Sequence, residues 1–353
     1  MSEQPGENGR LGSLFSENEE SPAGRRVAEG KTKKPVRKWL LLLIGLLTVV
    51  LVAGGFYVVR GLMALLDVER DSTIMPSYAG RPVEVPEVGS PMNFVLMGSD
   101  SRGEDRGRSD VLMVAHLSAD RDKLFIVSFP RDMYVEIPGH GKNKINAAYA
   151  FGKEALTIQT LENLLDVRMQ HAVLTDFTGF IGLTEQLGGV TVFNRYASEA
   201  NGYVYPRGEI TLKGEQALTY VRERYGLPNG DLDRAERQRT VVKAVALKLM
   251  KPQTLADPVK FNAVMSEVGK FFVVDSGLGL KEMWNIATSL KVNSGGDIQV
   301  LQAPIKGFGR SPAGASIDLV DFDRIKLMSE ALKNDTMADY FAKYGDQVLT
   351  AER

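Results

Sequence analysis

Acidic and arginine side chains gather where three apolar, strand-like runs of this chain begin and end. Asp100 follows the first run, and Asp110 opens the second. Arg131 and Asp132 follow the third run. Apolar runs that alternate with charged turns predict neighbouring strands, so Asp100 and Asp110 can face each other across one sheet edge. The three runs are Asn93–Gly98, Val111–Leu117 and Lys123–Phe129.

Carboxylates next to guanidinium groups suit a divalent cation and a phosphate. Mg²⁺ prefers oxygen ligands, and a planar guanidinium group binds phosphate through paired hydrogen bonds. Two further arginines, Arg102 and Arg108, lie between the first two runs. The pattern predicts a site for Mg²⁺, with Mn²⁺ as an alternative, and for a diphosphate. Acids and arginines in turns can also pair only with each other, and that alternative stays open for any single residue.

A second basic cluster lies further along the chain. Arg222 and Arg224 end one predicted helix, because a loop rich in glycine and proline follows them. Arg234 and Gln238 belong to the next predicted helix, where they lie one turn apart on the same face.

Composition narrows the classes of function. The chain has 353 residues, no cysteine and a formal net charge of −1. Disulfides, thiolate nucleophiles and cysteine-bound zinc are therefore excluded, and the overall charge does not favour nucleic-acid binding. The histidines lack the spacing of a metal site, and none lies near a plausible serine elbow, which argues against a serine hydrolase. They are His116, His140 and His171.

The segment Trp39–Val59 contains no charged residue. As a helix it has the length of a bilayer's hydrocarbon core, which predicts a single membrane span. The apolar run is too long for a cleaved signal peptide, so we expect an uncleaved anchor. Lysines and arginines precede the span, whereas Asp67 and Glu69 follow it. The positive-inside rule then predicts a cytoplasmic N-terminus and an extracytoplasmic domain in the cell membrane. No ATP pool exists there, so the expected phosphoryl donor is an activated one such as a lipid-linked diphosphate.

Periodicity and composition divide the chain into consecutive parts. Predicted strands and helices alternate over the long C-terminal part, which favours one domain with a three-layer α/β/α sandwich and a central mixed sheet. Its later elements are helices at 153–165, 176–187, 213–224, 233–251, 257–270, 279–290, 322–334 and 336–344, strands at 171–175, 190–193 and 298–303, a hairpin or extended loop at 203–212, and a loop through Ile317. The parts are a disordered tail (1–38), a transmembrane helix (39–60), an extracytoplasmic stalk (61–90), the α/β/α domain (91–344) and a C-terminal tail (345–353).

Several segments in series resemble the successive motifs of the LytR-CpsA-Psr family. They cover about residues 92–240 and follow a single predicted membrane anchor. The segments are NFVLMGSDSR, RSDVLMVAHL, FIVSFPRDMYVEIPG, KINAAYAFG, TDFTGFIGLTEQLGGV, LKGEQALTYVRER and DLDRAERQR.

The resemblance implies a membrane-anchored phosphotransferase. Such an enzyme moves a glycopolymer, such as wall teichoic acid, capsule or arabinogalactan, from a polyprenyl diphosphate carrier onto peptidoglycan. The implied partners are that lipid-linked donor, the peptidoglycan acceptor and the cytoplasmic membrane. The implied fold is an α/β/α sandwich with an apolar pocket for the prenyl chain, which helices 153–165 and 177–187 would line.

Carried over by position, the resemblance gives roles to individual residues. Asp100 and Asp110 are expected to bind Mg²⁺. Arg102 and Asp132 match the motifs without a defined role and, with Arg108 and Arg131, are candidate catalytic residues. Asp132 is a candidate general base, because a sugar hydroxyl that attacks phosphorus must lose a proton; orientation of Arg131 or a neighbour by ion pairing is the alternative. The expected diphosphate contacts are Arg108, Arg131, Lys144, Arg222, Arg224, Arg234 and Gln238.

Two alternatives to the transferase remain open from the sequence. A non-catalytic, membrane-tethered regulator could bind lipid phosphate or wall polymer, although the presence of both acids and all the arginines argues against it. A polyprenyl diphosphate diphosphatase would use the same site with water in place of the acceptor.

Overall fold

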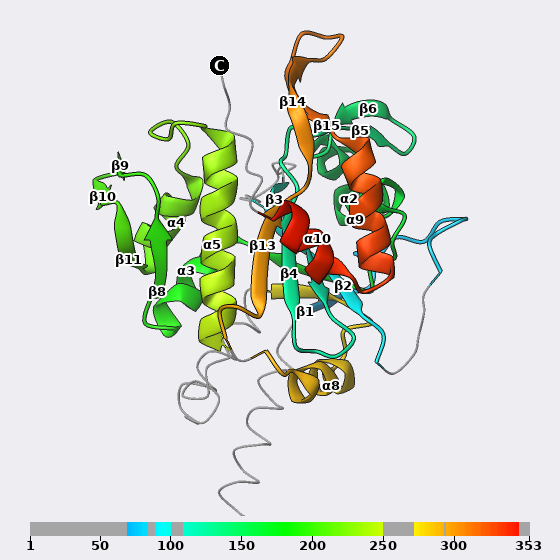
Figure 1. The fold of residues 1–353 in the computed structure, drawn as a ribbon, viewed down its shortest axis with the longest axis horizontal. Coiled ribbons are helices and arrows are strands. Elements are labelled where there is room, and N and C mark those ends of the chain that lie inside the picture. Colours follow the sequence, from blue (N-terminus) through cyan, green and yellow to red (C-terminus); the bar gives the residue numbers. More distant parts are fainter. Residues whose placement is uncertain (1–68, 84–88, 100–108, 250–271, 293, 346–353) are drawn as a thin grey trace, which may run out of the picture. The chain divides into compact units, whose positions relative to one another are not determined.

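A seven-stranded mixed sheet forms the centre of the described structure, in the order β1-β12-β7-β2-β3-β4-β13 (Figure 1). The computed structural model describes residues 69–83, 89–99, 109–249, 272–292 and 294–345. Strands β2, β3 and β4 are antiparallel neighbours, whereas β2 and β7 pair in parallel, as do β4 and β13. The mixed α/β fold predicted from the sequence is therefore confirmed. The strands are β1 (Glu69–Asp71), β2 (Met92–Ser99), β3 (Ser109–Leu117), β4 (Leu124–Ser128), β7 (His171–Thr175), β12 (Phe272–Asp275) and β13 (Ile298–Gln302).

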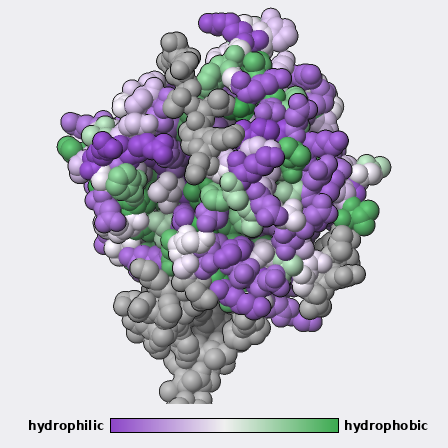
Figure 2. All heavy atoms as spheres, viewed as in Figure 1, coloured by the Kyte–Doolittle hydropathy of each residue, from purple (hydrophilic) through white to green (hydrophobic). Residues whose placement is uncertain are grey.

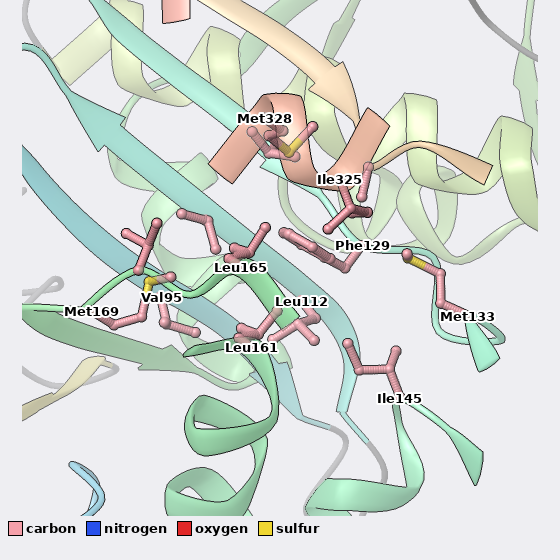
Figure 3. Close-up of a cluster of buried hydrophobic side chains, with 14 of the residues drawn as sticks. Val95, Leu112, Phe129, Met133, Ile145, Leu161, Leu165, Met169, Ile325 and Met328 are labelled. Carbon is pink, nitrogen blue, oxygen red and sulfur yellow. The ribbon is translucent and has the colours of Figure 1, made fainter. Parts of the chain in front are cut away.

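One face of the sheet packs against helices α2 (Ala147–Leu165), α9 (Phe322–Lys333) and α10 (Met337–Tyr344). Alternate strand residues, among them Val95, point to this face and meet Leu161 and Leu165 of α2 and Met328 of α9 (Figure 3). All four side chains are almost completely buried. Each such side chain contributes about 2 kcal/mol relative to an exposed one. The cluster on this face is larger than the other buried apolar clusters of the described residues.

The opposite face carries α3 (Phe177–Gln186), α4 (Gly214–Arg222) and α5 (Asp231–Leu249). Phe94 and Leu96 of β2 point this way, and Val242 of α5 packs into the same apolar cluster. Helix α8 (Leu280–Ser289) packs beside this region through Ile286 and Met283. Helices thus cover both faces of the sheet, with α5 on one side and α2 and α9 on the other (Figure 1).

A small lobe built from antiparallel hairpins adjoins α4 and α5 (Figure 1). Tyr205 and Tyr220 are buried in its core, and the guanidinium group of Arg237 lies 4.2 Å from the centre of the Tyr220 ring. This arrangement fixes α5 against the lobe. Its strands are β8 (Val190–Asn194), β9 (Ser198–Ala200), β10 (Tyr203–Tyr205) and β11 (Gly208–Leu212).

Two hairpins were not recognised from the sequence. Strands β5 (Tyr134–Ile137) and β6 (Gly141–Lys144) pair around a turn in which Gly139 has φ 76°. The expected loop before Ile317 is wrong, because β14 (Ile305–Arg310) pairs with β15 (Ser316–Val320). Glycines within β14 hide the alternation that marks a strand, and β15 gains a further bridge from Met133 to Asp318.

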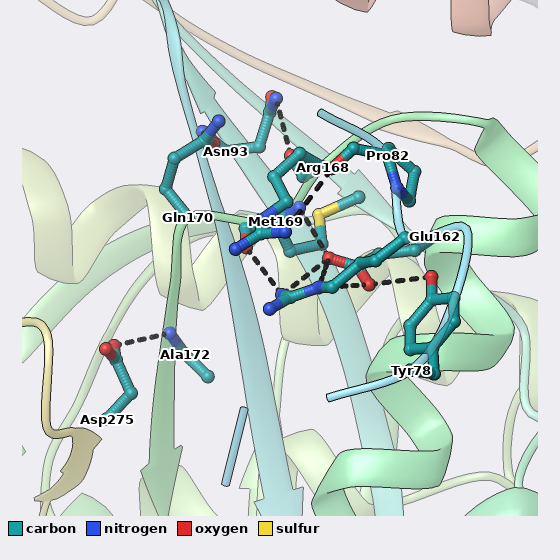
Figure 4. Close-up of polar contacts among 10 residues, drawn as sticks. Tyr78, Pro82, Asn93, Glu162, Arg168, Met169, Gln170, Ala172 and Asp275 are labelled. Atoms are coloured by element: carbon teal, nitrogen blue, oxygen red, sulfur yellow. Dashed lines mark hydrogen bonds and ion pairs between the residues drawn. The ribbon is translucent and has the colours of Figure 1, made fainter. Parts of the chain in front are cut away.

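The chain between 69 and 83 packs onto the domain, which corrects the expected stalk at 61–90 for these residues. β1 forms the edge of the sheet beside β12, and the side chain of Ile74 is buried in the core. Glu162 of α2 has no exposed surface; it accepts hydrogen bonds from Tyr78 Oη at 2.9 Å and Arg81 Nη2 at 2.7 Å (Figure 4). Burial and the neighbouring Glu162 carboxylate raise the pKa of Tyr78, so its hydroxyl stays a donor.

Other predictions fall outside the described residues. They include the tail at 1–38, the span Trp39–Val59, the helix at 257–270 and the end of the chain from 346. Within the described parts of the chain, no helix has both the length and the apolar character that a membrane crossing requires.

Candidate functional site

A cavity of about 410 Å³ lies between the central sheet and helices α3, α4 and α5. Strands β2, β3, β7 and β12 contribute one wall, and the three helices contribute the others. Hydrophilic side chains predominate among the described residues on the face drawn in Figure 2, and its hydrophobic areas are small and separate. In contrast to this surface, the lining of the cavity is mostly apolar and includes Leu96, Met113, Leu183, Val245 and Phe272.

Cationic side chains line the same cavity. Arg131 follows β4, Arg222 and Arg224 lie at the end of α4, and Arg234 lies in the first turns of α5. The fold therefore brings Arg131 of the first cluster together with the arginines of the second cluster. A cavity with aliphatic walls and guanidinium groups suits a ligand with a long apolar part and an anionic head.

Helix α3 begins at this cavity because Asp176 caps it. The Asp176 carboxylate accepts a hydrogen bond from the backbone N–H of Gly179 at 2.8 Å, which satisfies one of the free donors of the first turn. The next residue, Phe177, lines the cavity, and the guanidinium carbon of Arg222 lies 4.5 Å from the centre of its ring. A cation over an aromatic face is attracted by about 1 kcal/mol, so Phe177 helps to hold Arg222 at the cavity.

Asp231 joins two of the arginines. Arg234 Nη2 lies 2.9 Å from Asp231 Oδ1, and Arg131 Nε lies 3.2 Å from Asp231 Oδ2. Asp231 is in the first turn of α5, where the helix dipole favours a negative charge. One carboxylate thus orients guanidinium groups that come from β4 and α5. The sequence motifs contain Asp231, but only the fold shows that both arginines reach it.

Lys144 and Asp132 form an ion pair with an Nζ–Oδ1 distance of 2.8 Å. Lys144 stands at the end of β6, and Asp132 is also 4.0 Å from Arg131 Nε. Neither Lys144 nor Asp132 is among the residues that line the cavity. The structure therefore contains the ion pairing that was the alternative role of Asp132, and its partner at short distance is Lys144.

The acids expected to bind the metal are described only in part. Asp100, Arg102 and Arg108 lie outside the described residues, and Asp110 belongs to β3 without a described side chain. The backbone register pairs Ser99 of β2 with Ser109 of β3, and an irregularity in the pairing lies beside them. Within the described residues, no cluster of three or more acidic or histidine side chains could hold a metal ion.

Comparison with known proteins identifies the family of this chain. The sequence model of the LytR_cpsA_psr (LytR-CpsA-Psr) family matches residues 67–334. The chain belongs to this family.

Relatives of known name extend the comparison. A polyisoprenyl-teichoic acid–peptidoglycan teichoic acid transferase, TagU of Enterococcus faecalis, is 34% identical over 248 residues, which are 69% of this chain and 79% of the relative. TagU of Bacillus subtilis is 32% identical over 305 residues, or 86% of this chain and 96% of the relative. The solved structure of TagT bound to LI-WTA has a TM-score of 0.59 at 25% identity and covers 76% of this chain and 99% of that chain.

Helix α3 lines the cavity of this LytR-CpsA-Psr protein, but α2 does not. The expectation that helices 153–165 and 177–187 both line the pocket is therefore wrong for the first of them. Apolar residues of α2 face the opposite side of the sheet, where Leu161 and Leu165 join the main core. Helix α5 lines the cavity instead of α2, through Val241 and Val245. An apolar stripe does not reveal which face of the sheet a helix covers, so the sequence could not separate these cases.

Buried polar contacts hold α5 against the elements that carry the arginines. Arg239 Nη1 donates to Ser128 Oγ of β4 at 2.7 Å, and burial lowers the pKa of Arg239 to about 10. Gln238 Nε2 donates to the backbone carbonyl of Val221 in α4 at 3.2 Å. These contacts fix the spacing between Arg131, just beyond β4, and Arg234 on α5.

Sequence reasoning missed Asp318, which lies on β15. Burial raises the pKa of the Asp318 carboxyl to about 7; the neighbouring Asp132 and Asp231 add to the effect, whereas Lys144 and Arg131 oppose it. No motif in the sequence singles out this residue. Its segment was expected to follow a loop, so nothing suggested that it would approach the charged residues around Arg131.

Proposed function

We propose that this protein is a membrane-anchored phosphotransferase that moves a glycopolymer from a polyprenyl diphosphate carrier onto peptidoglycan. The observation that carries the proposal is the apolar cavity of about 410 Å³ lined also by Arg131, Arg222, Arg224 and Arg234. A prenyl chain would occupy its aliphatic part, and the diphosphate would bind the arginines. The names of the TagU relatives, and TagT in complex with LI-WTA, support a transferase that acts on wall polymer.

The proposed reaction is a phosphoryl transfer. A hydroxyl oxygen of the acceptor bonds to the phosphorus that carries the glycan. The bond from this phosphorus to the bridging oxygen breaks, and its electron pair leaves with the polyprenyl phosphate. The hydroxyl proton passes to a base on the protein. The product is a phosphodiester between the glycan and peptidoglycan.

The arginines would mainly stabilise the negative charge that develops during this reaction. Negative charge grows on the bridging oxygen as the polyprenyl phosphate leaves, and guanidinium groups already held in place stabilise it without reorganisation. Asp231 holds Arg131 and Arg234, and Phe177 holds Arg222. Loss of one such donor typically costs about 3 kcal/mol, or roughly a hundredfold in rate.

A divalent cation at Asp100 and Asp110 is part of the proposal. The pairing of Ser99 with Ser109 supports it, because Asp110 is the next residue of β3 and Asp100 is the next residue of the chain after Ser99. Two carboxylates and a diphosphate provide the oxygen ligands that Mg²⁺ or Mn²⁺ prefers, so the residues fit the ion. When bound, the ion would neutralise charge on the diphosphate oxygens. Arg102 and Arg108, which lie between the two acids in the sequence, are proposed to assist there.

The site is proposed to lie outside the cell, anchored by Trp39–Val59. Charge asymmetry around this segment supports a cytoplasmic N-terminus. A reporter that is active only in the cytoplasm should be inactive when fused after Arg353. Activity of that reporter would overturn the topology and the argument for a lipid-linked donor.

The deciding experiment uses the full chain in detergent with Mg²⁺, a polyprenyl diphosphate-linked glycan and peptidoglycan fragments. We expect the glycan to become covalently attached to peptidoglycan, and Asp100→Ala or Asp110→Ala to abolish nearly all transfer without unfolding. Glycan released into water would identify a diphosphatase instead. Donor binding without turnover would identify a regulator. Wild-type rates for either Asp variant in the presence of a chelator would contradict the metal site.

A further inference from the structure

Strand β15 places a carboxylate beside the charged residues of the proposed site. The backbone N–H of Asp318 donates to the carbonyl of Asp132 at 2.9 Å, and Asp318 also forms a bridge with Met133. β15 is therefore joined to the segment that follows β4 and carries Arg131. These two contacts fix the Asp318 backbone relative to the segment that carries Arg131.

Charged groups of three other segments act on the Asp318 carboxyl. The segment after β4 contributes Arg131 and Asp132, β6 contributes Lys144, and α5 contributes Asp231. The two cations are already engaged, since Lys144 is 2.8 Å from Asp132 and Arg131 is 3.2 Å from Asp231. Burial raises the pKa of Asp318 to about 7, the carboxylates of Asp132 and Asp231 add to the effect, and the two cations oppose it.

A general base must meet two physical requirements. It must be able to take up a proton near the working pH, because a strongly stabilised carboxylate is a poor acceptor. It must also not already form an ion pair with a lysine or arginine side chain. Asp132 accepts from Lys144, and Asp231 is bound by Arg131 and Arg234. Of the three carboxylates in this group, Asp318 best meets both requirements.

We propose that Asp318 is the catalytic base that accepts the proton of the acceptor hydroxyl during transfer. The inference rests on the proposed phosphotransferase function. As the hydroxyl oxygen bonds to phosphorus, its proton moves to a carboxylate oxygen of Asp318, and the electron pair of the broken bond leaves with polyprenyl phosphate. Asp132 then keeps a positioning role, holding Lys144 at the site. The inference places the acceptor hydroxyl beside β15 when transfer occurs.

The test compares Asp318→Asn with wild type in the full chain, using the lipid-linked glycan and peptidoglycan fragments under single-turnover conditions from pH 5 to 9. Asn keeps the shape of the side chain and cannot take the proton. We expect the rate to fall by about 10²- to 10⁴-fold, while donor affinity stays within a few-fold of wild type. The wild-type rate should rise with pH to a plateau, with a midpoint near pH 7. The rate of the variant should not show this rise.

Asp323→Asn is the matched control, because Asp323 is exposed on α9 only a few residues away. It should leave the rate and its pH dependence unchanged. Asp318→Glu should recover part of the lost activity, since it restores a carboxylate. An Asp318→Asn protein that keeps the wild-type rate and its rise with pH would overturn the inference, as would equal losses of rate and donor affinity. Absence of transfer by the wild type would instead overturn the proposed function.

Discussion

Replacement of Glu162 by Gln tests whether residues 69–83 are an integral part of the domain. Glu162 is fully buried and binds Arg81 at 2.7 Å, Tyr78 at 2.9 Å and the backbone N–H of Met169 at 2.9 Å (Figure 4). Gln removes the negative charge and turns one acceptor into a donor that faces the Arg81 donors. Arg81 has only 11% of its side chain exposed, so its charge would remain in a poorly hydrated place.

Breaking one side of a buried ion pair costs about 3–5 kcal/mol. A domain of this size loses about 2 °C in Tm for each kcal/mol, so the Tm should fall by about 6–10 °C. Thermal unfolding of the full chain, followed by near-ultraviolet circular dichroism, measures the change. Glu154→Gln is a control on the same helix; Glu154 is partly exposed and accepts from Tyr149 at 2.8 Å. It should cost less than about 1 kcal/mol.

A double variant isolates the pairwise contribution. In Glu162→Gln with Arg81→Met, no buried cation remains without its partner, so the combined loss should be smaller than the sum of the two single losses. A Tm for Glu162→Gln within 1 °C of wild type would refute the reasoning. It would mean that the segment carrying Tyr78 and Arg81 is not docked on α2 in solution.

Further predictions concern the cavity, the arginines and acid stability. Val245→Trp should fill part of the apolar cavity and weaken binding of a polyprenyl diphosphate by about tenfold or more, while inorganic diphosphate, measured by calorimetry, should bind as to wild type. Arg222→Lys and Arg224→Lys keep the charge but lose the planar fork, so transfer should fall by about tenfold to a hundredfold in a single-turnover assay; a wild-type rate would place these arginines outside the site. Burial favours a higher pKa for Asp275, but hydrogen bonds from His171 and two backbone N–H groups outweigh it and hold the pKa below the ordinary value of 3.8. Its stabilisation is therefore present above about pH 4 and is lost as the pH falls further, so Asp275→Asn should lower the free energy of unfolding at pH 7 more than at pH 3 in urea titrations.

Local patterns in the sequence were enough for the central strands and several helices. The predicted runs Asn93–Gly98 and Val111–Leu117 lie within β2 and β3 of the structure, and the helix expected at 322–334 is α9 within one residue. Asp321 caps α9 by accepting from the backbone N–H of Arg324, a local signal that is present in the chain itself. These elements follow the periodicity of their own residues, so no distant contact was needed to find them.

Elements that depend on distant partners could not be predicted in this way. β1 has three residues, and it is a strand because β12, some 200 positions later, pairs with it. β14 and β15 contain too little apolar alternation to be recognised alone, and their pairing with each other and with Met133 defines them. Backbone hydrogen bonds between remote segments leave no periodic trace in either one.

The candidate site also combines features that the sequence predicts with features that depend on the tertiary structure. Residue types and motif order in the sequence named Arg131, Arg222, Arg224 and Arg234, because guanidinium groups near strand and helix ends are visible without a fold. Only the tertiary structure decided that these arginines share one apolar cavity. It also decided that Asp318 lies among Asp132, Asp231 and Lys144, where burial and like charges raise its pKa. Desolvation and Coulomb interactions depend on distances in space, which the order of residues along the chain does not contain.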